Sequence, residues 1–284
     1  MSADEQWLPS CSLAALRERG ALLAQLRQFF ADRNVLEVQT SCLGRYTVTD
    51  PHVDAIAVPG LGYLQTSPEY QLKRLLAAGA GSLYQIGPAF RAGESGRLHN
   101  PEFTMLEWYR LGYDDTALMA ELALLVDEVL GPADYHYATY AEVVAAAESP
   151  GDDRDLAYAD GLRALQSVRL FVTDFPPEQA ALARLRGSPP VAARFELVIA
   201  GVEIANGYYE LGDVRQLTAR FSLDLAQRRE RGAAEPRMDP AFLAAMDAGL
   251  PECAGVAIGV DRLLMLKLGA KSLAEVMPFP IDRA

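Results

Sequence analysis

The most informative segment of this chain is residues 90–109, which read FRAGESGRLHNPEFTMLEWY. The pattern predicts a strand that ends at Arg91, a polar loop, and a second strand over 102–113. Alternation along the second strand places four side chains on one face, Phe103, Met105, Glu107 and Tyr109. A carboxylate on an apolar strand face is costly unless it meets a cation. That cation is either an arginine of the core, in a plain salt bridge, or the ammonium group of a ligand.

The segments around this pair of strands mix helical and strand patterns. Leucines at helical spacing predict a helix from Ser12 to about Asn34, and Pro68 is expected in the first turn of another helix. The other predicted strands lie at 35–38, 45–66, 194–199, 202–206 and 255–258, and the other helices at 67–78, 116–130, 214–231, 240–249 and 260–268. Residues 138–190 carry the weakest signal, and we expect short helices there that form a small subdomain or lid.

Length and charge limit the classes of protein that this chain can represent. It has 284 residues, half of them hydrophobic, which is enough for a sizeable core. The formal net charge is -12, and such a surface repels phosphate backbones at long range. The composition therefore argues against a nucleic-acid binder, although a local basic patch is compatible with an acidic total.

The cysteines and the N-terminus point to the cytoplasm. Cys11, Cys42 and Cys253 are odd in number and far apart, without the spacing of metal ligands. They predict buried, reduced thiols. The N-terminus is acidic and lacks an apolar stretch, so we expect no signal peptide. No apolar run approaches the length of a membrane span, so we expect no membrane partner.

A predicted hairpin at 196–206 brings two carboxylates together. If Ala200 and Gly201 form a two-residue turn, Glu196 and Glu203 become diagonal neighbours on one face. Such a pair repels unless a cation lies between them, and a magnesium ion that also binds substrate phosphates would fit. The alternative is an exposed acidic face. Gly207 is expected to relieve the backbone where the second strand bends, and Glu210 would then enter the same cleft.

Arg262 lies in the first turn of the last predicted helix, where a positive charge is unfavourable. It requires either an anion such as phosphate, which the helix amides also favour, or a salt bridge with an acid such as Asp261. Glu69, at another helix start, is either a dipole partner or a ligand-binding carboxylate. Two arginines, a carboxylate pair and further acids together predict a site for ATP and an amine-bearing acid. Positioned arginines and metal ions supply most of the catalysis in such chemistry.

Five short segments resemble those of class II aminoacyl-tRNA synthetases of the lysyl type. Residues 90–91 and 99–104 (FR and HNPEFT) resemble motif 2, residues 259–262 (GVDR) motif 3, and residues 35–40 (VLEVQT) the dimer-forming motif 1. Residues 67–70 (SPEY) and 203–207 (EIANG) resemble lysine-pocket segments. The resemblance spans about residues 12–284. It implies an α+β fold, a single catalytic domain over 1–284 with an antiparallel β-sheet flanked by helices, and a homodimer.

Lysyl-tRNA synthetases also have an N-terminal anticodon-binding barrel, for which we find no sequence here. The chain therefore resembles most the elongation factor P–lysine ligase family, synthetase paralogues without that domain. The resemblance implies activation of lysine, preferably (R)-β-lysine, with ATP and Mg²⁺, and transfer to a lysine of elongation factor P, with no tRNA partner. One alternative is a stand-alone lysyl-tRNA synthetase-like enzyme that charges RNA. Another is a non-catalytic, synthetase-derived regulatory or binding subunit.

The resemblance also implies roles for residues of the nucleotide site. Arg91 would hold the α-phosphate and the substrate carboxylate, Arg262 the γ-phosphate, and Phe103 would stack on adenine. Glu196 and Glu203 would bind magnesium. The remaining residues of the ATP site would be Ala92, Gly93, Glu94, His99, Asn100, Leu197 and Gly259.

The amino-acid site is implied in the same way. The proximal amine would be received by the segment Ser67, Pro68 and Glu69. The distal ammonium would be received by Glu107, Tyr109 and Glu210, with Glu203, Ala205 and Asn206 also lining the substrate. Lysyl-tRNA synthetases usually have glycine where Ala205 stands, and one methyl group there would reshape the space in which α- and β-amino acids differ.

The chain departs from the family pattern at three places. Motif 2 normally reads Arg-x-Glu, but Gly93 stands at the third position and Glu94 follows it, so Glu94 is expected to replace the missing acid. Motif 1 usually ends in Thr-Pro, and here Ser41 follows Thr40, which is expected to affect the dimer element more than the chemistry. The middle region is short for the family, so we expect any lid there to be reduced.

Overall fold

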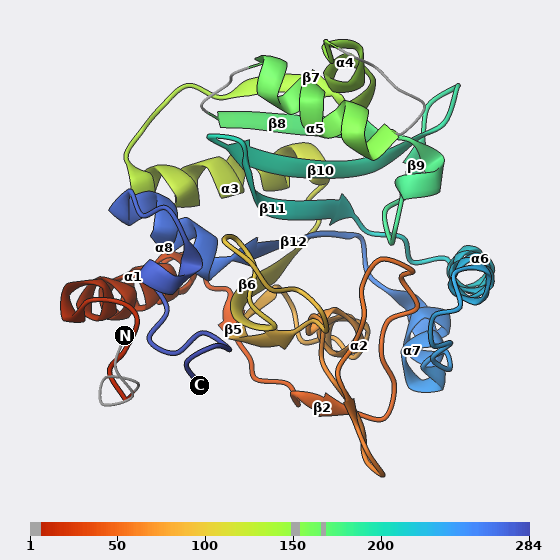
Figure 1. The fold of residues 1–284 in the computed structure, drawn as a ribbon. Helices are drawn as coiled ribbons and strands as arrows, with labels where there is room; N and C mark the ends of the chain where they lie inside the picture. The colour runs from red at the N-terminus through yellow and green to blue at the C-terminus, as the bar shows by residue number, and fades with distance from the viewer. Residues whose placement is uncertain (1–6, 149–153, 166–168) are drawn as a thin grey trace. The chain divides into compact units, whose positions relative to one another are not determined.

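The computed structural model describes residues 7–148, 154–165 and 169–284, and the chain divides into two compact units (Figure 1). Unit 1 comprises Met1–Trp108, Gly212–Pro251 and Gly259–Ala284. Unit 2 comprises Tyr109–Leu211 and Glu252–Ile258. The expectation of a single domain over the whole chain stays a prediction.

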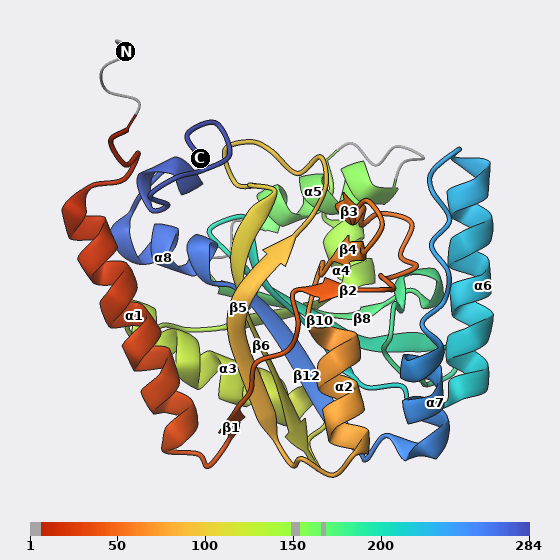
Figure 2. The ribbon, with the colours of Figure 1, turned by 90° about the horizontal axis from the view of Figure 1, so that it is seen from below.

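Unit 1 combines five helices with short strands, one long strand and most of a second long strand (Figure 2). Its elements are α1 (Leu13–Ala31), β1 (Leu36–Glu37), β2 (Leu43–Gly44), β3 (Ala57–Val58), β4 (Gly62–Leu64), α2 (Glu69–Ala77), β5 (Leu83–Phe90), most of β6 (Glu102–Leu111), α6 (Val214–Glu230), α7 (Pro240–Gly249) and α8 (Val260–Leu268). Strand β1 pairs with β5 in parallel, and β5 neighbours β6. Strands β2, β4 and β3 form a small antiparallel sheet.

Helix α1 begins after Ser12, as the sequence predicts, and ends at Ala31, three residues before the expected Asn34. The Ser12 hydroxyl accepts a hydrogen bond from the Ala15 amide and caps the helix. The ring of Phe30 stacks on Tyr84 of β5 at 4.3 Å between centroids and meets Trp108 of β6 edge-on. These three rings are almost fully buried, so α1 fixes the strands that end at the predicted motif 2 loop.

Helices α2 and α7 pack side by side through aromatic stacking. The rings of Tyr70 and Phe242 lie 4.1 Å apart and nearly parallel. Pro68 occupies the N-cap of α2, and Glu69 is the first helical residue. The expectation that Pro68 lies in the first turn is therefore one residue early, and Glu69 takes the position where the helix amides favour a carboxylate.

Unit 2 is a sheet with helices packed on it (Figure 1). Its elements are α3 (Asp115–Leu130), β7 (His136–Thr139), α4 (Tyr140–Ala145), α5 (Arg154–Leu165), β8 (Arg169–Phe175), a 3₁₀ turn (Pro177–Gln179), β9 (Leu185–Arg186), β10 (Val191–Ile199), β11 (Val202–Tyr209) and β12 (Cys253–Gly259). The strand order is β12, β11, β10, β8 and β7, with β9 paired to β10. All these pairs are antiparallel except β7 with β8.

The weakly patterned stretch 138–190 supplies part of this sheet. The expected short helices are α4 and α5, but strands β8 and β9 were not predicted there. Tyr140 and Val143 of α4 pack with Leu170 and Val172 of β8 in a buried cluster. Gly161 of α5 lets the two helices touch, because a Cβ there would lie 1.8 Å from the Val143 carbonyl oxygen. The stretch is thus held to the sheet by a core of its own.

The β10–β11 hairpin turns at the residues predicted for it. Ala200 and Gly201 both have positive φ, at 49° and 75°, as a type I′ turn requires. The fold is α+β, as predicted, and most strand pairs of described direction are antiparallel, whereas β1 pairs with β5 and β7 with β8 in parallel.

Two further expectations concern buried cysteine thiols and membrane-spanning segments. Cys11 and Cys253 are buried free thiols, whereas Cys42 is half-buried, so the prediction of burial is wrong for that residue. Among the described residues, none of the helices has the length and apolar character that crossing a membrane requires.

Candidate active site

Arg91 stands where β5 gives way to the predicted motif 2 loop. Its backbone amide donates to the Pro101 carbonyl at 2.8 Å, which closes the base of the loop. Its Nε donates to the Thr66 carbonyl at 3.4 Å, and its guanidinium carbon lies 5.3 Å from the centroid of the Phe103 ring. The structure therefore brings together the two groups that are predicted to hold the α-phosphate and the adenine.

The loop after Arg91 has the backbone conformation that glycine permits. Gly93 has φ of 78°, a region that other residues rarely adopt, which gives a physical reason for glycine at this departure from the motif. Glu94 lies 3.6 Å from Arg91, with Oε1 facing Nη1. The Ala92 amide donates to the Asp54 carbonyl at 2.7 Å. Glu94 is thus close to Arg91, and its replacement of the motif's acid stays a prediction.

Arg262 reaches back to the same loop from the first turn of α8. Its Nε donates to the Leu98 carbonyl at 3.2 Å, and its Nη2 lies 2.8 Å from His99 Nε2. Gly259 is the N-cap of α8, and a Cβ there would lie 3.7 Å from Cδ of Arg262. Arg262 and His99, two of the predicted ATP ligands, are therefore neighbours.

Asp261, the alternative partner of Arg262, has other contacts. Its buried carboxylate accepts from Arg19 Nη1 and from the Thr104 amide, both at 2.6 Å. Arg19 also donates to the Thr104 hydroxyl. This cluster joins α1, β6 and α8, and sequence reasoning missed Arg19 because it lies far away in the chain.

The Asn100 side chain forms hydrogen bonds with the backbone of the protein. Its side-chain nitrogen donates to the Glu102 carbonyl at 2.6 Å, and its oxygen accepts from the Ile281 amide at 2.9 Å. The residue is 5% exposed. These two hydrogen bonds hold the end of the loop. Asn100 therefore stabilises the loop structure, whether or not it also contacts the nucleotide.

The predicted amine-binding residues of unit 1 are adjacent. The Ser67 hydroxyl donates to Glu107 Oε2 at 2.6 Å and accepts from the Glu69 amide at 3.0 Å. Glu107 is only 3% exposed. Glu69 forms a salt bridge at 2.6 Å with Lys73, a fully buried residue one turn later that was not predicted. Ser67, predicted for the proximal amine, thus contacts Glu107, predicted for the distal ammonium, and the roles of these residues stay predictions.

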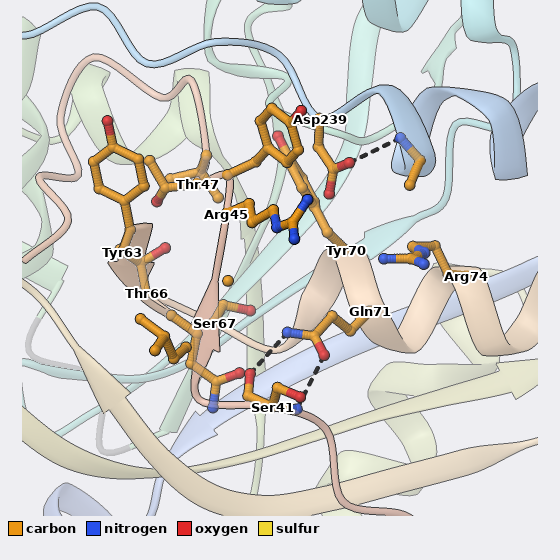
Figure 3. Close-up of a pocket in the computed structure, with 16 residues that line it drawn as sticks. Ser41, Arg45, Thr47, Tyr63, Thr66, Ser67, Tyr70, Gln71, Arg74 and Asp239 are labelled. Atoms are coloured by element: carbon orange, nitrogen blue, oxygen red, sulfur yellow. Dashed lines mark hydrogen bonds between the residues drawn. The ribbon is translucent and has the colours of Figure 1, made fainter. Parts of the chain in front are cut away.

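A cavity of about 400 Å³ opens on the other side of Ser67 (Figure 3). It is lined by residues of 41–48, 63–71 and the start of α7, together with Arg74. Arg45 and Arg74 face it, and neither has an ion pair or side-chain hydrogen bond within the described part of the chain. Its size suits a small molecule or a protein side chain, and the two guanidinium groups favour an anionic one.

Glu196 of unit 2 lies among charged and polar partners. It is 7% exposed and forms a salt bridge with Arg194, and the Tyr158 hydroxyl donates to Glu196 Oε2 at 2.9 Å. Burial and the nearby charge of Glu203 raise the pKa of Glu196 despite Arg194. The positive group beside Glu196 is therefore at least partly Arg194, which the sequence analysis did not consider.

Glu196 and Glu203 are close, as the hairpin predicts, but their register is irregular. Val198 faces Glu203 and Glu196 faces Asn206, with a shift between Leu197 and Val198. Glu203 is exposed. Burial and the charge of Glu196 raise the pKa of Tyr158, and the charge of Glu203 adds to this effect. Asn206 accepts from Arg194 Nε at 3.2 Å. The predicted metal pair thus consists of one buried and one exposed carboxylate.

Two other predicted residues of unit 2 meet at Gly255 of β12. A Cβ on Gly255 would lie 2.3 Å from the Tyr109 ring and 2.6 Å from Glu210 Oε1. Tyr109 and Glu210 are buried, so glycine at 255 is what allows both to lie there. Ala205 is buried one strand away, opposite Ile258.

Position 207 requires glycine for a different reason from the one expected. Its φ is not positive, and a Cβ there would lie 2.3 Å from the Phe195 ring. The glycine makes room for a core aromatic ring instead of relieving a bend. Since Phe195 is on the neighbouring strand β10, the hairpin register and this packing support each other.

The two carboxylates of Glu196 and Glu203 suit magnesium better than a metal that needs several protein side chains as ligands. Among the described residues, no group of three or more His, Cys, Asp or Glu side chains could hold a metal ion. Two carboxylates suffice for Mg²⁺ when phosphate oxygens and water complete its coordination. Glu196 and Glu203 therefore fit a nucleotide-bound magnesium ion, and their role as its ligands stays a prediction.

Comparison with known proteins decides the family. The model of the family described as tRNA synthetases class II (D, K and N) matches residues 10–283. The chain belongs to this family. It is 43% identical to the elongation factor P–(R)-β-lysine ligase of Vibrio cholerae over 99% of each chain. It is 42% identical to the ligase of that name from Vibrio vulnificus and 41% to that of Salmonella paratyphi B, over the full length of both.

These relatives identify the chain as an enzyme of the ligase class, and the synthetase family implies the use of ATP. The alignment with the Vibrio vulnificus ligase spans 325 residues, so that relative has segments without a counterpart among the 284 residues here. The expectation that the middle region is short for the family stays a prediction.

The departure at Ser41 has a structural reason. The Ser41 amide donates to the Gln71 side chain at 3.0 Å, and the Gln71 side chain donates back to the Ser41 carbonyl at 2.8 Å (Figure 3). Proline could not supply that amide. This reciprocal pair ties the end of the motif 1 segment to α2.

Proposed function

We propose that this protein activates lysine or (R)-β-lysine with ATP and transfers the acyl group to a lysine ε-amine of elongation factor P. The observation that carries the proposal is 41–43% identity, over the whole length, to relatives that bear this ligase name. The adjacency of Arg91 to Phe103 and of Arg262 to His99 supports it, because an adenylate-forming site needs these groups together.

In the first step the substrate carboxylate attacks the α-phosphorus of ATP. A carboxylate–phosphorus bond forms, the bond to the β-phosphate oxygen breaks, and pyrophosphate leaves. Arg91 would stabilise the charge that develops at the α-phosphate, and Arg262 would hold the γ-phosphate. Mg²⁺ held by Glu196 and Glu203 would neutralise phosphate charge.

In the second step an uncharged lysine ε-amine attacks the acyl carbon of the adenylate. An amide bond forms, AMP leaves with the bonding electrons, and the amine loses a proton. The substrate's amines would be held by Ser67 and Glu69 at one end and by Glu107, Tyr109 and Glu210 at the other. The buried position of Glu107, Tyr109 and Glu210 supports this role, because a buried carboxylate gains most from a cationic ligand.

The wider setting belongs to the same proposal. The enzyme would work as a homodimer in the cytoplasm, with elongation factor P and not tRNA as its acceptor. The acidic net charge supports a protein acceptor, because an acidic surface repels an RNA backbone.

The test is intact-mass analysis of elongation factor P after incubation with the enzyme, Mg·ATP and either α-lysine or (R)-β-lysine. We expect a mass increase of one lysyl group, larger in yield with one isomer, and no label on tRNA in a parallel reaction. Labelled tRNA with unmodified elongation factor P would contradict the proposal in favour of an RNA-charging enzyme. A folded sample without lysine-dependent ATP–pyrophosphate exchange would contradict it in favour of a regulatory subunit.

A further inference from the structure

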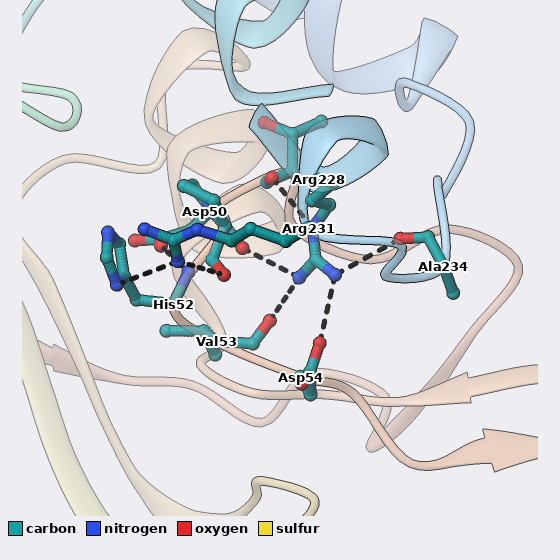
Figure 4. A network of polar contacts seen from close by, with 9 residues as sticks. Asp50, His52, Val53, Asp54, Arg228, Arg231 and Ala234 are labelled. Atoms are coloured by element: carbon teal, nitrogen blue, oxygen red, sulfur yellow. Dashed lines mark hydrogen bonds and ion pairs between the residues drawn. The ribbon is translucent and has the colours of Figure 1, made fainter. Parts of the chain in front are cut away.

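Arg228, near the end of α6, is buried beneath residues 49–54 of the same unit (Figure 4). It is 3% exposed. Its Nε donates to the Thr49 carbonyl at 3.0 Å, and its Nη2 donates to the carbonyls of Asp50 at 2.7 Å and Val53 at 2.6 Å. One side chain thus gathers three carbonyls of a segment that has no regular secondary structure.

The third nitrogen of the Arg228 guanidinium group, Nη1, also donates two hydrogen bonds. Nη1 donates to Asp54 Oδ1 at 2.9 Å and to the Ala234 carbonyl at 3.1 Å. A guanidinium group has five N–H donors in a planar fork, and five acceptors surround this one. A lysine ammonium has three donors at a single point and cannot span the same acceptors. The contacts therefore require arginine for its geometry as well as its charge.

Segment 49–54 connects this arginine to the predicted ATP loop. The Asp54 carbonyl accepts from the Ala92 amide at 2.7 Å, directly after Arg91. At the other end of the segment, the Thr49 hydroxyl donates to Asp224, one turn before Arg228 on α6, at 2.8 Å. The path from the buried guanidinium to the backbone beside Arg91 thus runs through one short segment and one hydrogen bond.

We infer that Arg228 is a positioning residue for nucleotide binding. It fixes segment 49–54, and this segment fixes the backbone of Ala92 and so the direction in which Arg91 leaves β5. This role rests on the proposed function of Arg91 in holding the α-phosphate. Misplacement of a phosphate ligand by about 1 Å costs up to about a hundredfold in rate, so the effect should reach catalysis from a residue that does not touch the substrate.

Arg231 offers a matched control, because it lies one turn further along and contacts the same segment. Its exposed side chain contacts the Pro51 carbonyl and His52 Nδ1, both at 3.3 Å (Figure 4). These contacts are with Pro51 and His52 in the middle of the segment, and not with Val53 or Asp54. Loss of Arg231 should therefore leave the Asp54–Ala92 hydrogen bond in place.

The experiment compares Arg228→Lys, Arg228→Ala and Arg231→Ala with the wild-type chain. For each, thermal unfolding is recorded, and lysine-dependent ATP–pyrophosphate exchange gives kcat and KM for ATP and for the amino acid. We expect Arg228→Lys to fold and to lose roughly ten- to a hundredfold in kcat/KM for ATP, with KM for the amino acid unchanged. Arg231→Ala should match the wild type.

Wild-type kinetics for a folded Arg228→Lys protein would overturn the inference, and so would an equal loss in Arg231→Ala. Failure of Arg228→Lys to fold would also overturn it, because the residue would then serve the fold alone. If the wild-type chain shows no exchange, the proposed function fails, and calorimetric titration with Mg·ATP still compares the variants. Equal ATP affinity of wild type and Arg228→Lys would then contradict the positioning role.

Discussion

The two units hold the charged side chains that are predicted to bind ATP and magnesium in different ways. In unit 1, Arg262 donates to the Leu98 carbonyl, which carries only partial charge. Arg91 donates to the Thr66 carbonyl and also lies 3.6 Å from the half-buried carboxylate of Glu94. In unit 2, Glu196 is buried in a full salt bridge with Arg194. An arginine held by carbonyls keeps most of its charge for a phosphate, whereas a buried ion pair serves the fold as well. Substitutions in the two units should therefore separate catalysis from stability to different degrees.

The largest effect on activity is expected for Arg262→Ala in unit 1. Loss of the predicted γ-phosphate ligand should reduce ATP–pyrophosphate exchange by about 10²–10³-fold, as the removal of one charge-stabilising donor does. The unfolding midpoint should change little, because Arg262 donates to one carbonyl and one imidazole on the loop. Arg215→Ala, at an exposed position of α6, is the control. Near-normal exchange in Arg262→Ala would remove its assigned role.

Glu196→Gln in unit 2 should affect both properties. The change removes the salt bridge to the half-buried Arg194, which costs about 3 kcal/mol of unfolding free energy, and it removes a predicted magnesium ligand. Glu203→Gln is the matched variant, because Glu203 is exposed and should lose exchange without losing stability. Urea unfolding and exchange at several Mg²⁺ concentrations measure the two effects. Equal stability losses in both variants would refute the contrast between the units.

Arg19→Met, next to the buried Asp261 of unit 1, should reduce stability and leave ATP binding unchanged. It leaves Asp261 with the Thr104 amide as its hydrogen-bond donor in place of two donors, at a cost of about 2 kcal/mol of unfolding free energy. The KM for ATP should stay close to wild type if Asp261 serves only the fold. Urea unfolding and exchange kinetics on the same sample test this, and a stable variant with impaired ATP binding would assign the cluster to the site instead.

The smallest effect is expected at Ala205 of unit 2. Ala205→Gly removes one buried methyl group, and such a change alters discrimination between similar substrates by about tenfold. The ratio of kcat/KM for (R)-β-lysine and α-lysine in the exchange assay should fall toward α-lysine. An unchanged ratio would show that this methyl group does not distinguish the isomers.

The sequence analysis predicted best where a site is built from neighbours in the chain. The loop from Arg91 to Phe103 and the hairpin that carries Glu196 and Glu203 were both recognisable, because strand alternation and turn residues act locally. Helices α7 and α8 were predicted to the residue because Pro240 and Gly259 mark clear starts. Ser12 likewise marks the start of α1.

The supporting residues were missed because their partners are distant or their local pattern is weak. Arg228 contacts carbonyls more than 170 residues earlier in the chain, which no local period encodes. Tyr158, a partner of Glu196, lies in the stretch that gave little signal. Strand β8 was detectable in principle, since residues 169–175 read RLFVTDF, a short apolar run of the kind that fills a central strand.

The account depends on a single ATP molecule that both arginines and both glutamates act on. A double-mutant cycle with Arg262→Ala and Glu203→Gln tests this most directly, by the ATP-dependent kcat/KM of pyrophosphate exchange. Groups that act as one unit are strongly non-additive, so we predict that the double variant loses little more than the worse single variant. Losses that multiply, as for two independent sites, would contradict the account.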